Sequence, residues 1–269
     1  MVTNTVRDQL PYLKENGRMI FFTDFDGTIT LQDTACSLFC TLKVDNYGFG
    51  RQTREVLELE LLQGKITFRE AFRTMLDSVQ LPFEKCLQAL KENIKFDSHF
   101  IAFYHWAKEH EVPIVVLSSG MAPVIQSLLE KLLGDKPENI FVVANDIEPR
   151  QGKDKECDHI RKRDWEISFR DNSHFGHDKS LAIRPYRELT SRNRPTLLYA
   201  GDGVSDLSAA SETDILFAKS GMGLVKHCER EGIPFAPFDT WASVLIAVQA
   251  IYEAGNTEDL ENVAVTEVG

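Results

Sequence analysis

Short apolar runs, each followed by small or polar residues, constrain the fold of this chain more than any other feature. Four such runs stand out, and they span residues 19–23, 112–117, 140–144 and 196–200, with a weaker fifth at 214–218. Continuous apolar runs of strand length that alternate with helical stretches are typical of a parallel sheet buried on both faces. The sequence therefore predicts an α/β fold with a doubly wound parallel sheet.

Polar residues follow several of these runs. In doubly wound sheets, ligands bind in the crevice at the carboxyl ends of the strands. Asp24, Ser118 and Asp202 each follow a predicted strand, so we expect their side chains to converge in one crevice. Helical periodicity at 122–133 and 204–212 accounts for two of the connections between strands.

The segment after the first strand contains helical patterns without a strand signal. We expect helices there over residues 34–41, 51–63, 67–79, 83–93 and 99–110. Thr67 and Glu70 have the spacing of a capping box at the start of the third helix. A block of helices inserted at this point is most simply a second small domain, a cap that covers the crevice.

The predicted domain boundaries follow from this pattern. We assign residues 1–32 and 112–255 to the core and residues 33–111 to an inserted all-helical cap. Within the core, the stretch 148–178 is charged and broken by Gly and Pro, and residues 165–169 alternate like a half-buried strand, which predicts a hairpin or loop excursion. The acidic segment 256–269 lacks periodicity and predicts a flexible tail.

Charge and cysteine content narrow the classes of partner. Thirty Lys and Arg against 41 Asp and Glu give a formal charge of −11, which disfavours nucleic acids and anionic membranes as partners. The five cysteines are an odd number without a CxxC pair, and no apolar run is long enough to cross a bilayer. We therefore expect a cytoplasmic protein with reduced thiols, either a monomer or a homodimer.

Two acidic motifs lie at predicted strand ends. Asp24 and Asp26 precede Gly27, where a turn would let both carboxylates face the crevice. Asp202 and Asp206 follow the fourth run, and a helical turn would place them together. Four carboxylates in a dry crevice repel one another, and a divalent cation would relieve that repulsion. Oxygen ligands without His or Cys favour Mg²⁺ over zinc, so all four acids are predicted metal-binding residues.

A second group of polar residues could bind an anion. Ser118, Ser119 and Gly120 end the second run and precede a predicted helix, where hydroxyl and backbone N–H groups bind phosphate oxygens. The ammonium of Lys179 would add a positive charge. Taken singly, a Ser at a helix start is more often a cap and a Lys more often a solvated surface charge.

Together these motifs resemble the haloacid dehalogenase superfamily of phosphatases. The four family motifs occur in order as DFDGT at residues 24–28, Ser118, Lys179 and GDGVSD at residues 201–206. The resemblance covers residues from about 17 to 218, and a helical cap after the first motif is similar to the phosphoserine-phosphatase branch. SSGM, GHDK and GDGVSDL resemble the fungal polyol phosphatases and, more distantly, the diketomethylthiopentyl-phosphate phosphatases of methionine salvage.

The resemblance implies a Mg²⁺-dependent phosphomonoesterase and gives each residue a role. Asp24 would form an aspartyl-phosphate, and Asp26 would protonate the leaving oxygen and then activate water. Ser118 and Lys179 would bind the phosphoryl oxygens, with Ser119 as the alternative hydroxyl because this chain has Ser-Ser-Gly where the family often has Ser-Gly-Gly. Asp206 would orient a metal-bound water or hold Lys179.

Substrate choice is expected to lie in the cap. By resemblance, Asp33 and Arg73 would read the substrate, although Asp33 could equally cap a helix and Arg73 could be a surface residue. His177, beside Lys179, is expected to be structural. The predicted substrate is a small polyol or sugar phosphate, with phosphoserine or a methionine-salvage phosphate as the alternative. A phosphate-binding or phospho-accepting regulatory module is the non-enzyme alternative, which the intact Asp26 and Asp206 disfavour.

Overall fold

A seven-stranded sheet lies at the centre of the computed structural model, which describes residues 10–14, 17–34, 56–57, 59–61, 63–150, 163–190 and 194–255. The strand order is β4-β3-β2-β1-β5-β6-β7. The strands are β1 (Met19–Thr23), β2 (Ile114–Met121), β3 (Ile140–Pro149), β4 (Trp165–Ser168), β5 (Thr196–Gly201), β6 (Ile215–Lys219) and β7 (Ala236–Phe238). Neighbouring strands pair in parallel except β4, which pairs antiparallel with β3.

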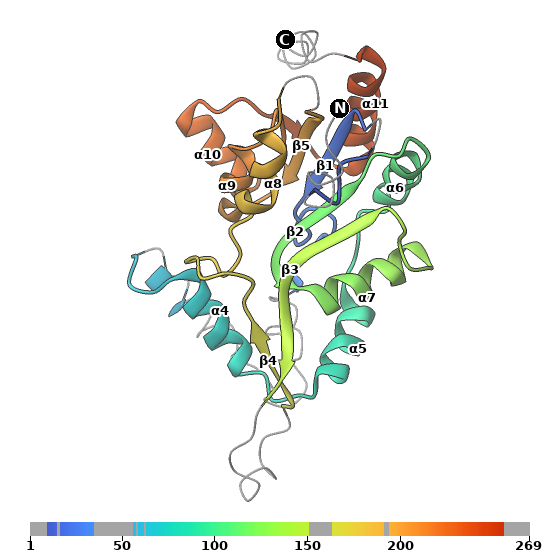
Figure 1. Ribbon diagram of the computed structural model, residues 1–269. Coiled ribbons are helices and arrows are strands. Elements are labelled where there is room, and N and C mark those ends of the chain that lie inside the picture. Colours follow the sequence, from blue (N-terminus) through green and yellow to red (C-terminus); the bar gives the residue numbers. More distant parts are fainter. Residues whose placement is uncertain are drawn as a thin grey trace, which may run out of the picture.

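Helices cover both faces of the sheet, as the doubly wound prediction requires (Figure 1). The helices on one face are α6 (Phe100–Glu109), α7 (Ala122–Leu133) and α11 (Trp241–Ala254). The other face carries α8 (Ser180–Arg187), α9 (Leu207–Ala210) and α10 (Gly223–Glu231). Successive residues of β1 alternate between the two cores, with Phe21 packed in the first and Phe22 in the second. This double burial explains the uninterrupted apolar run in the sequence.

The stretch 204–212, where helical periodicity was expected, forms two short helical pieces. A 3₁₀ turn at Val204–Asp206 precedes the short helix α9. The carboxylate of Asp206 accepts the backbone N–H groups of Asp202 and Gly203, each at 2.9 Å, and so tightens the chain where it leaves β5. The strand pattern at 165–169 was read correctly, because β4 forms a hairpin-like pair with β3.

Part of the predicted insert is described. Helices α4 (Phe68–Asp77) and α5 (Phe83–Asn93) occupy two of the expected positions. The capping box is present: Thr67 N donates to Glu70 Oε2 at 2.7 Å, and Glu70 N donates to Thr67 Oγ1 at 3.2 Å. Several expectations fall mostly or wholly outside the described residues: the helices at 34–41 and 51–63, residues 151–162 of the expected hairpin or loop excursion, and the tail at 256–269.

The helices of the predicted insert differ in what they contact. On α6, the Phe103 ring lies 4.7 Å from that of Phe21 in β1 and 4.8 Å from that of Trp241, measured between ring centroids, so this helix belongs to the main core. By contrast, α4 and α5 lie beside a two-stranded extension formed by the far ends of β3 and β4 (Figure 1). Trp165 Nε1 of β4 donates to Leu81 O at 3.0 Å in this region.

The insert leaves and rejoins the core at neighbouring points. Thr30 forms an isolated antiparallel bridge with Phe96. Leu31 N donates to Lys95 O at 2.9 Å, and Asp97 N donates to Ile29 O at 3.0 Å. The chain after β1 and the chain before α6 are therefore tied side by side.

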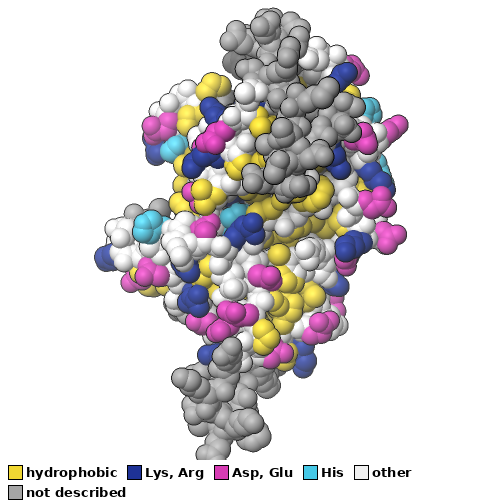
Figure 2. Space-filling model, viewed as in Figure 1, with side chains coloured by type: hydrophobic (Ala, Val, Ile, Leu, Met, Phe, Trp, Pro, Cys, Tyr) yellow, Lys and Arg dark blue, Asp and Glu magenta, His cyan; other side chains and the backbone are white. Residues whose placement is uncertain are grey.

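The visible surface is mixed in character. Figure 2 shows acidic and basic side chains interspersed, with hydrophobic side chains gathered near the centre of the face on view. Within the part of the chain that is described, no helix has both the length and the apolar composition of a membrane span.

Candidate functional site

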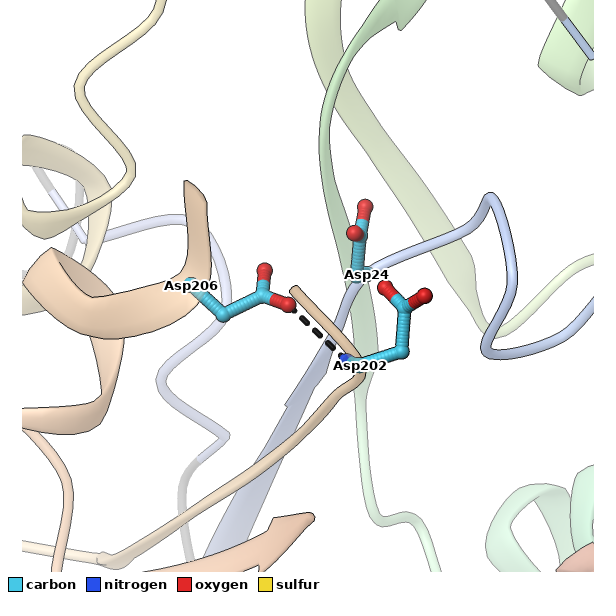
Figure 3. A group of neighbouring side chains, drawn as sticks. All are labelled: Asp24, Asp202 and Asp206. Atoms are coloured by element: carbon cyan, nitrogen blue, oxygen red, sulfur yellow. Dashed lines mark hydrogen bonds between the residues drawn. The ribbon is translucent and has the colours of Figure 1, made fainter. Parts of the chain in front are cut away.

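The carboxyl ends of β1 and β5 bring three acids together, as predicted. Asp24 N donates to Ala200 O at 2.8 Å, which places the residue after β1 beside the end of β5. One carboxylate oxygen from each of Asp24, Asp202 and Asp206 lies within 4.8 Å of the others. Figure 3 shows the Asp24 and Asp202 carboxyl groups next to each other, with Asp206 approaching from the neighbouring turn.

Lys179 is buried among these acids, with 1% of its surface exposed. Its Nζ lies 2.9 Å from Asp24 Oδ1 and 2.7 Å from Asp206 Oδ1. Burial disfavours the charged ammonium, but the two carboxylates outweigh that effect and hold the pKa of Lys179 above its usual value. The predicted positive charge is therefore present at the Asp24 carboxylate.

Asp206 acts as an anchor in this arrangement. Its Oδ1 accepts hydrogen bonds from Lys179 and, at 2.6 Å, from the hydroxyl of Tyr199. Its Oδ2 accepts the backbone N–H groups of Asp202 and Gly203. Of the two roles implied by resemblance, holding Lys179 is the one that this geometry displays.

The acid cluster carries more negative charge than Lys179 balances. Burial raises the pKa of Asp24 to about 7, with Lys179 acting in the opposite direction. Burial, followed by the charges of Asp24 and Asp206, raises the pKa of Asp202 to about 8. The backbone also approaches closely here: Gly27 has φ +73°, and a Cβ on it would lie 2.3 Å from Asp202 Oδ2. Crowded carboxylate oxygens of this kind fit a hard divalent cation.

Asp26 stands apart from that cluster. Among the described residues, the group of acids that could share a cation contains Asp24, Asp202 and Asp206 but not the side chain of Asp26. Asp26 Oδ1 instead accepts the N–H of Thr34 at 2.8 Å. Burial, then the charges of Asp33 and Asp24, raises the pKa of Asp26 to about 8. A group with this pKa holds a proton at neutral pH, as a general acid must.

The last residues of β2, at Ser118–Gly120, lie beside Asp26. A Cβ placed on Gly120 would lie 3.2 Å from Ser118 Oγ and 3.4 Å from Asp26 Oδ2, so the hydroxyl and the carboxyl group border the same small space. Ser118 Oγ also accepts the N–H of Gly120 at 3.0 Å. The hydroxyl of Ser119 is buried and has no hydrogen-bond partner. The predicted phosphate-binding residues therefore lie next to the predicted acid.

The two predicted substrate-reading residues are placed differently. Asp33 is exposed and close enough to raise the pKa of Asp26. Arg73 is exposed on α4, with its guanidinium 5.0 Å from the centre of the Phe169 ring, in the loop before α8. The structure thus brings Asp33 to the acid and places Arg73 against an aromatic ring.

Sequence reasoning missed two residues at this edge of the sheet. Tyr199 lies inside the apolar run of β5, and its hydroxyl was the only polar signal there. Lys219 ends β6 one residue after Ala218, which pairs with Gly201, so it lies level with Asp202. Its Nζ is buried without a hydrogen-bond partner. The sequence signal that could have revealed Lys219 was its position, as a charged residue at the end of an apolar run.

Comparisons with known proteins point to one enzyme family. Residues 21–211 match the model of the haloacid dehalogenase-like hydrolases. Pdp3-interacting factor 1 of Schizosaccharomyces pombe is 44% identical over 241 residues, which are 89% of this chain and 99% of that protein. Polyol phosphate phosphatase PYP1 of Saccharomyces cerevisiae is 38% identical over 255 residues, 91% of this chain and 99% of that protein.

A solved structure supports the fold. The crystal structure of phosphoserine phosphatase from T. onnurineus superposes with a TM-score of 0.56 at 14% identity, covering 86% of this chain and 94% of that one. At this identity the likeness concerns the fold alone. It agrees with the doubly wound sheet described above.

Proposed function

The chain belongs to the haloacid dehalogenase-like hydrolase family and is a phosphoric monoester hydrolase, and we propose that it dephosphorylates a small polyol or sugar phosphate. The observation that supports the reaction is the buried ammonium of Lys179 between Asp24 and Asp206, with Asp26 and Ser118 close together beside Gly120. The substrate class rests on the similarity to the yeast polyol phosphate phosphatase along nearly the whole chain.

The proposed first step uses Asp24 as nucleophile. Phe25 N donates to Asp24 Oδ1 at 2.7 Å and Lys179 lies 2.9 Å from the same oxygen, so the carboxylate is fixed before substrate arrives. A bond forms between an Asp24 oxygen and phosphorus as the bond from phosphorus to the ester oxygen breaks. Asp26 gives its proton to that ester oxygen, and the alcohol leaves.

The second step returns Asp24 to its starting state. Asp26, now ionised, takes a proton from a water molecule, whose oxygen attacks phosphorus and releases Asp24 and inorganic phosphate. Ser118 and Lys179 bind the phosphoryl oxygens in both steps. Asp24 and Asp202 would hold a divalent cation, proposed to be Mg²⁺, which when bound supplies positive charge between the nucleophile and the phosphate.

Metal binding should be visible in stability without any turnover. An unfolded Asp ionises near its ordinary pKa of 3.8, whereas Asp24 and Asp202 in the folded chain ionise at about 7 and about 8. As pH rises above 4 the unfolded state loses these protons first, so the metal-free fold loses stability until about pH 8. We expect the Tm in EDTA to fall by several degrees between about pH 6 and about pH 8.5, and MgCl₂ to restore it.

The control for this measurement is Asp202→Asn, with KCl at matched ionic strength. The variant removes one charge and one ligand, so its Tm in EDTA should depend less on pH and respond little to MgCl₂. If MgCl₂ raises the Tm of Asp202→Asn as much as that of the wild type, the cation does not bind at this cluster.

Asp33 should tune both acidity and substrate preference. Asp33→Asn removes a negative charge beside Asp26, so the pKa of Asp26 falls and the alkaline limb of the pH–rate profile moves to lower pH. Loss of the carboxylate should also raise the KM for a preferred polyol phosphate about tenfold, with little effect on p-nitrophenyl phosphate. Asp135→Asn, in the exposed loop after α7, is the control. An unshifted profile with equal losses on all substrates would contradict both roles.

The domain division also remains a proposal. We propose that α4, α5 and the β3–β4 extension form the substrate-selecting part together with the residues around Asp33. The packing of α6 on β1 and α11 supports a proposed end of this part before Phe100, instead of the expected end at residue 111. Arg73 belongs to this substrate-selecting part. Its guanidinium would have to move away from the Phe169 ring to contact a substrate.

A panel of phosphate esters tests the proposed function directly. The purified chain with MgCl₂ is assayed on linear polyol phosphates, sugar phosphates, phosphoserine and p-nitrophenyl phosphate. We expect the highest kcat/KM on a polyol or sugar phosphate. A preference for phosphoserine would overturn the substrate class, and no hydrolysis of any ester across the pH range would overturn the proposed reaction.

A further inference from the structure

Two consecutive carbonyl groups at the end of β2 are held by buried side chains from distant parts of the chain. His177 Nδ1 lies 2.9 Å from Ser118 O, and Asn145 Nδ2 donates to Ser119 O at 2.7 Å. His177 is 3% exposed and Asn145 is 0% exposed. The pairing of β2 with β3 shifts register between Ser118 and Met121, so carbonyl groups in this stretch need partners outside a regular ladder.

The His177 ring is a hydrogen donor in this contact. Burial lowers the pKa of His177 to about 4, so the ring is neutral at physiological pH. A neutral imidazole carries one N–H, and a carbonyl oxygen can only accept. The hydrogen therefore lies on Nδ1 and points at Ser118 O, as the Asn145 amide points at Ser119 O.

Holding these oxygens also sets the direction of the N–H groups. In a trans peptide the C=O and the following N–H point in opposite directions. Fixing Ser118 O therefore orients the N–H of Ser119, and fixing Ser119 O orients the N–H of Gly120, which donates to Ser118 Oγ. A peptide that turned over here would present a carbonyl oxygen to the phosphate and repel it.

From this geometry we propose that His177 and Asn145 are positioning residues, which hold the Ser118–Gly120 segment so that the Ser118 hydroxyl and the Ser119 N–H face a phosphate. The inference deepens the proposed function and rests on it. Neither side chain touches the reacting atoms. They act on the affinity of the Ser118–Gly120 segment for the phosphoryl group.

The loop that carries His177 is itself fixed. Gly176 has φ +74°, and a Cβ on it would lie 2.3 Å from the Phe169 ring, so only glycine fits before His177. Asp171 Oδ2 accepts the N–H of Asp178 at 2.7 Å. Arg170 N donates to Asn145 Oδ1 at 3.0 Å, which joins this loop to the second positioning residue.

The same loop is attached to the helix α4. Arg69 N donates to His174 O at 2.9 Å, and the Arg69 guanidinium donates to Asp171 O and lies 4.5 Å from the Phe169 ring centre. The segment that ends in His177 and Lys179 is therefore fixed on one side by α4 and on the other by the last residues of β2.

The test compares variants that remove each donor without adding charge. His177→Leu and Asn145→Leu lose the donor, whereas His177→Asn keeps an N–H near the position of Nδ1. The chain offers matched controls at the opposite end of the sheet: His110 Nδ1 lies 2.9 Å from Trp106 O, and Asn139 Nδ2 donates to Val112 O at 2.6 Å. His110→Leu and Asn139→Leu therefore remove the same kind of bond far from the crevice.

The probe is inorganic phosphate, measured as an inhibitor of p-nitrophenyl phosphate hydrolysis by the Mg²⁺-loaded full chain, with Tm recorded for every variant. We expect the inhibition constant and the KM to rise about tenfold in His177→Leu and Asn145→Leu, more than kcat falls. His177→Asn should recover most of this loss. The control variants should lower the Tm but keep the inhibition constant within about twofold of the wild type.

Inhibition constants that stay within about twofold in His177→Leu and Asn145→Leu, with the Tm lowered as in the controls, would overturn the inference and leave the proposed function intact. A wild-type chain that hydrolyses no ester would instead overturn the proposed function. If His177→Leu does not fold, His177→Asn and His177→Gln are compared, and equal phosphate binding by wild type and both variants would also overturn it.

Discussion

Asp24→Asn is expected to abolish hydrolysis of p-nitrophenyl phosphate, with kcat falling by at least about 10³-fold. An amide is a far weaker nucleophile than the carboxylate, while its shape and its hydrogen bond from the Phe25 N–H can be kept. Lys179 keeps its contact with Asp206 in the variant, so the fold should persist. Steady-state kinetics with MgCl₂ and a thermal melt measure the two quantities together.

Asp214→Asn is the matched control for this substitution. Its carboxylate also accepts a backbone N–H, that of Leu197 at 2.8 Å, but at the opposite end of the sheet. This variant should melt earlier and turn over at the wild-type rate. A folded Asp24→Asn protein with wild-type kcat would remove Asp24 as the nucleophile.

Lys179→Met is expected to lower both activity and stability. The substitution leaves the Asp24 and Asp206 carboxylates buried without their counter-charge, and breaking a buried pair in this way destabilises a fold by about 3–5 kcal/mol. Turnover should fall to background because the ammonium beside the attacking carboxylate is lost. Urea unfolding in EDTA at neutral pH measures the change in stability.

The pH dependence of that destabilisation provides a second check. Burial already raises the pKa of Asp24 to about 7, so this group takes up a proton readily in mildly acidic solution. Protonation removes the unpaired charge, and the deficit of Lys179→Met should shrink as pH falls. Lys108→Met, which breaks an exposed pair with Glu138, should have little effect at any pH. Equal losses in both variants would contradict the proposed role of the buried pair.

Helices and strands whose pattern lies within their own residues could be predicted from the sequence. β1, α5 and α7 occupy the residues that their apolar periodicity indicated, because each buries a face of fixed repeat. β7 was missed: it has three residues and includes Pro237, a residue that strand patterns normally exclude except at a sheet edge. The contact between α6 and α11 could not be read from the sequence either, since nothing local to α6 shows that Trp241, far along the chain, is its partner.

The site also contains residues that the sequence predicted and contacts that it did not. Asp24, Asp202 and Lys179 were predicted as site residues because they stand at strand ends or match a known motif, and their side chains do lie together. Holding Lys179 was only one of the two roles expected for Asp206. Four groups donate hydrogen bonds to its carboxylate, and one of them, the hydroxyl of Tyr199, lies within an apolar strand where no sequence pattern pointed to it. The contacts of His177 and Asn145 could not be read from any local pattern, because their partners lie 59 and 26 residues away in the chain.

The bridge between Thr30 and Phe96 has a consequence for how this architecture can change. The inserted segment leaves and rejoins the core at adjacent, hydrogen-bonded positions. The distance between these two attachment points therefore stays the same whatever residues the segment contains. Loop-closure entropy grows only slowly with length, so a longer or shorter segment can be exchanged there without disturbing the strands beneath. The strands of the core and the inserted segment are thereby free to diverge separately in sequence, and we expect a chimera that swaps residues between these two positions to keep the central sheet.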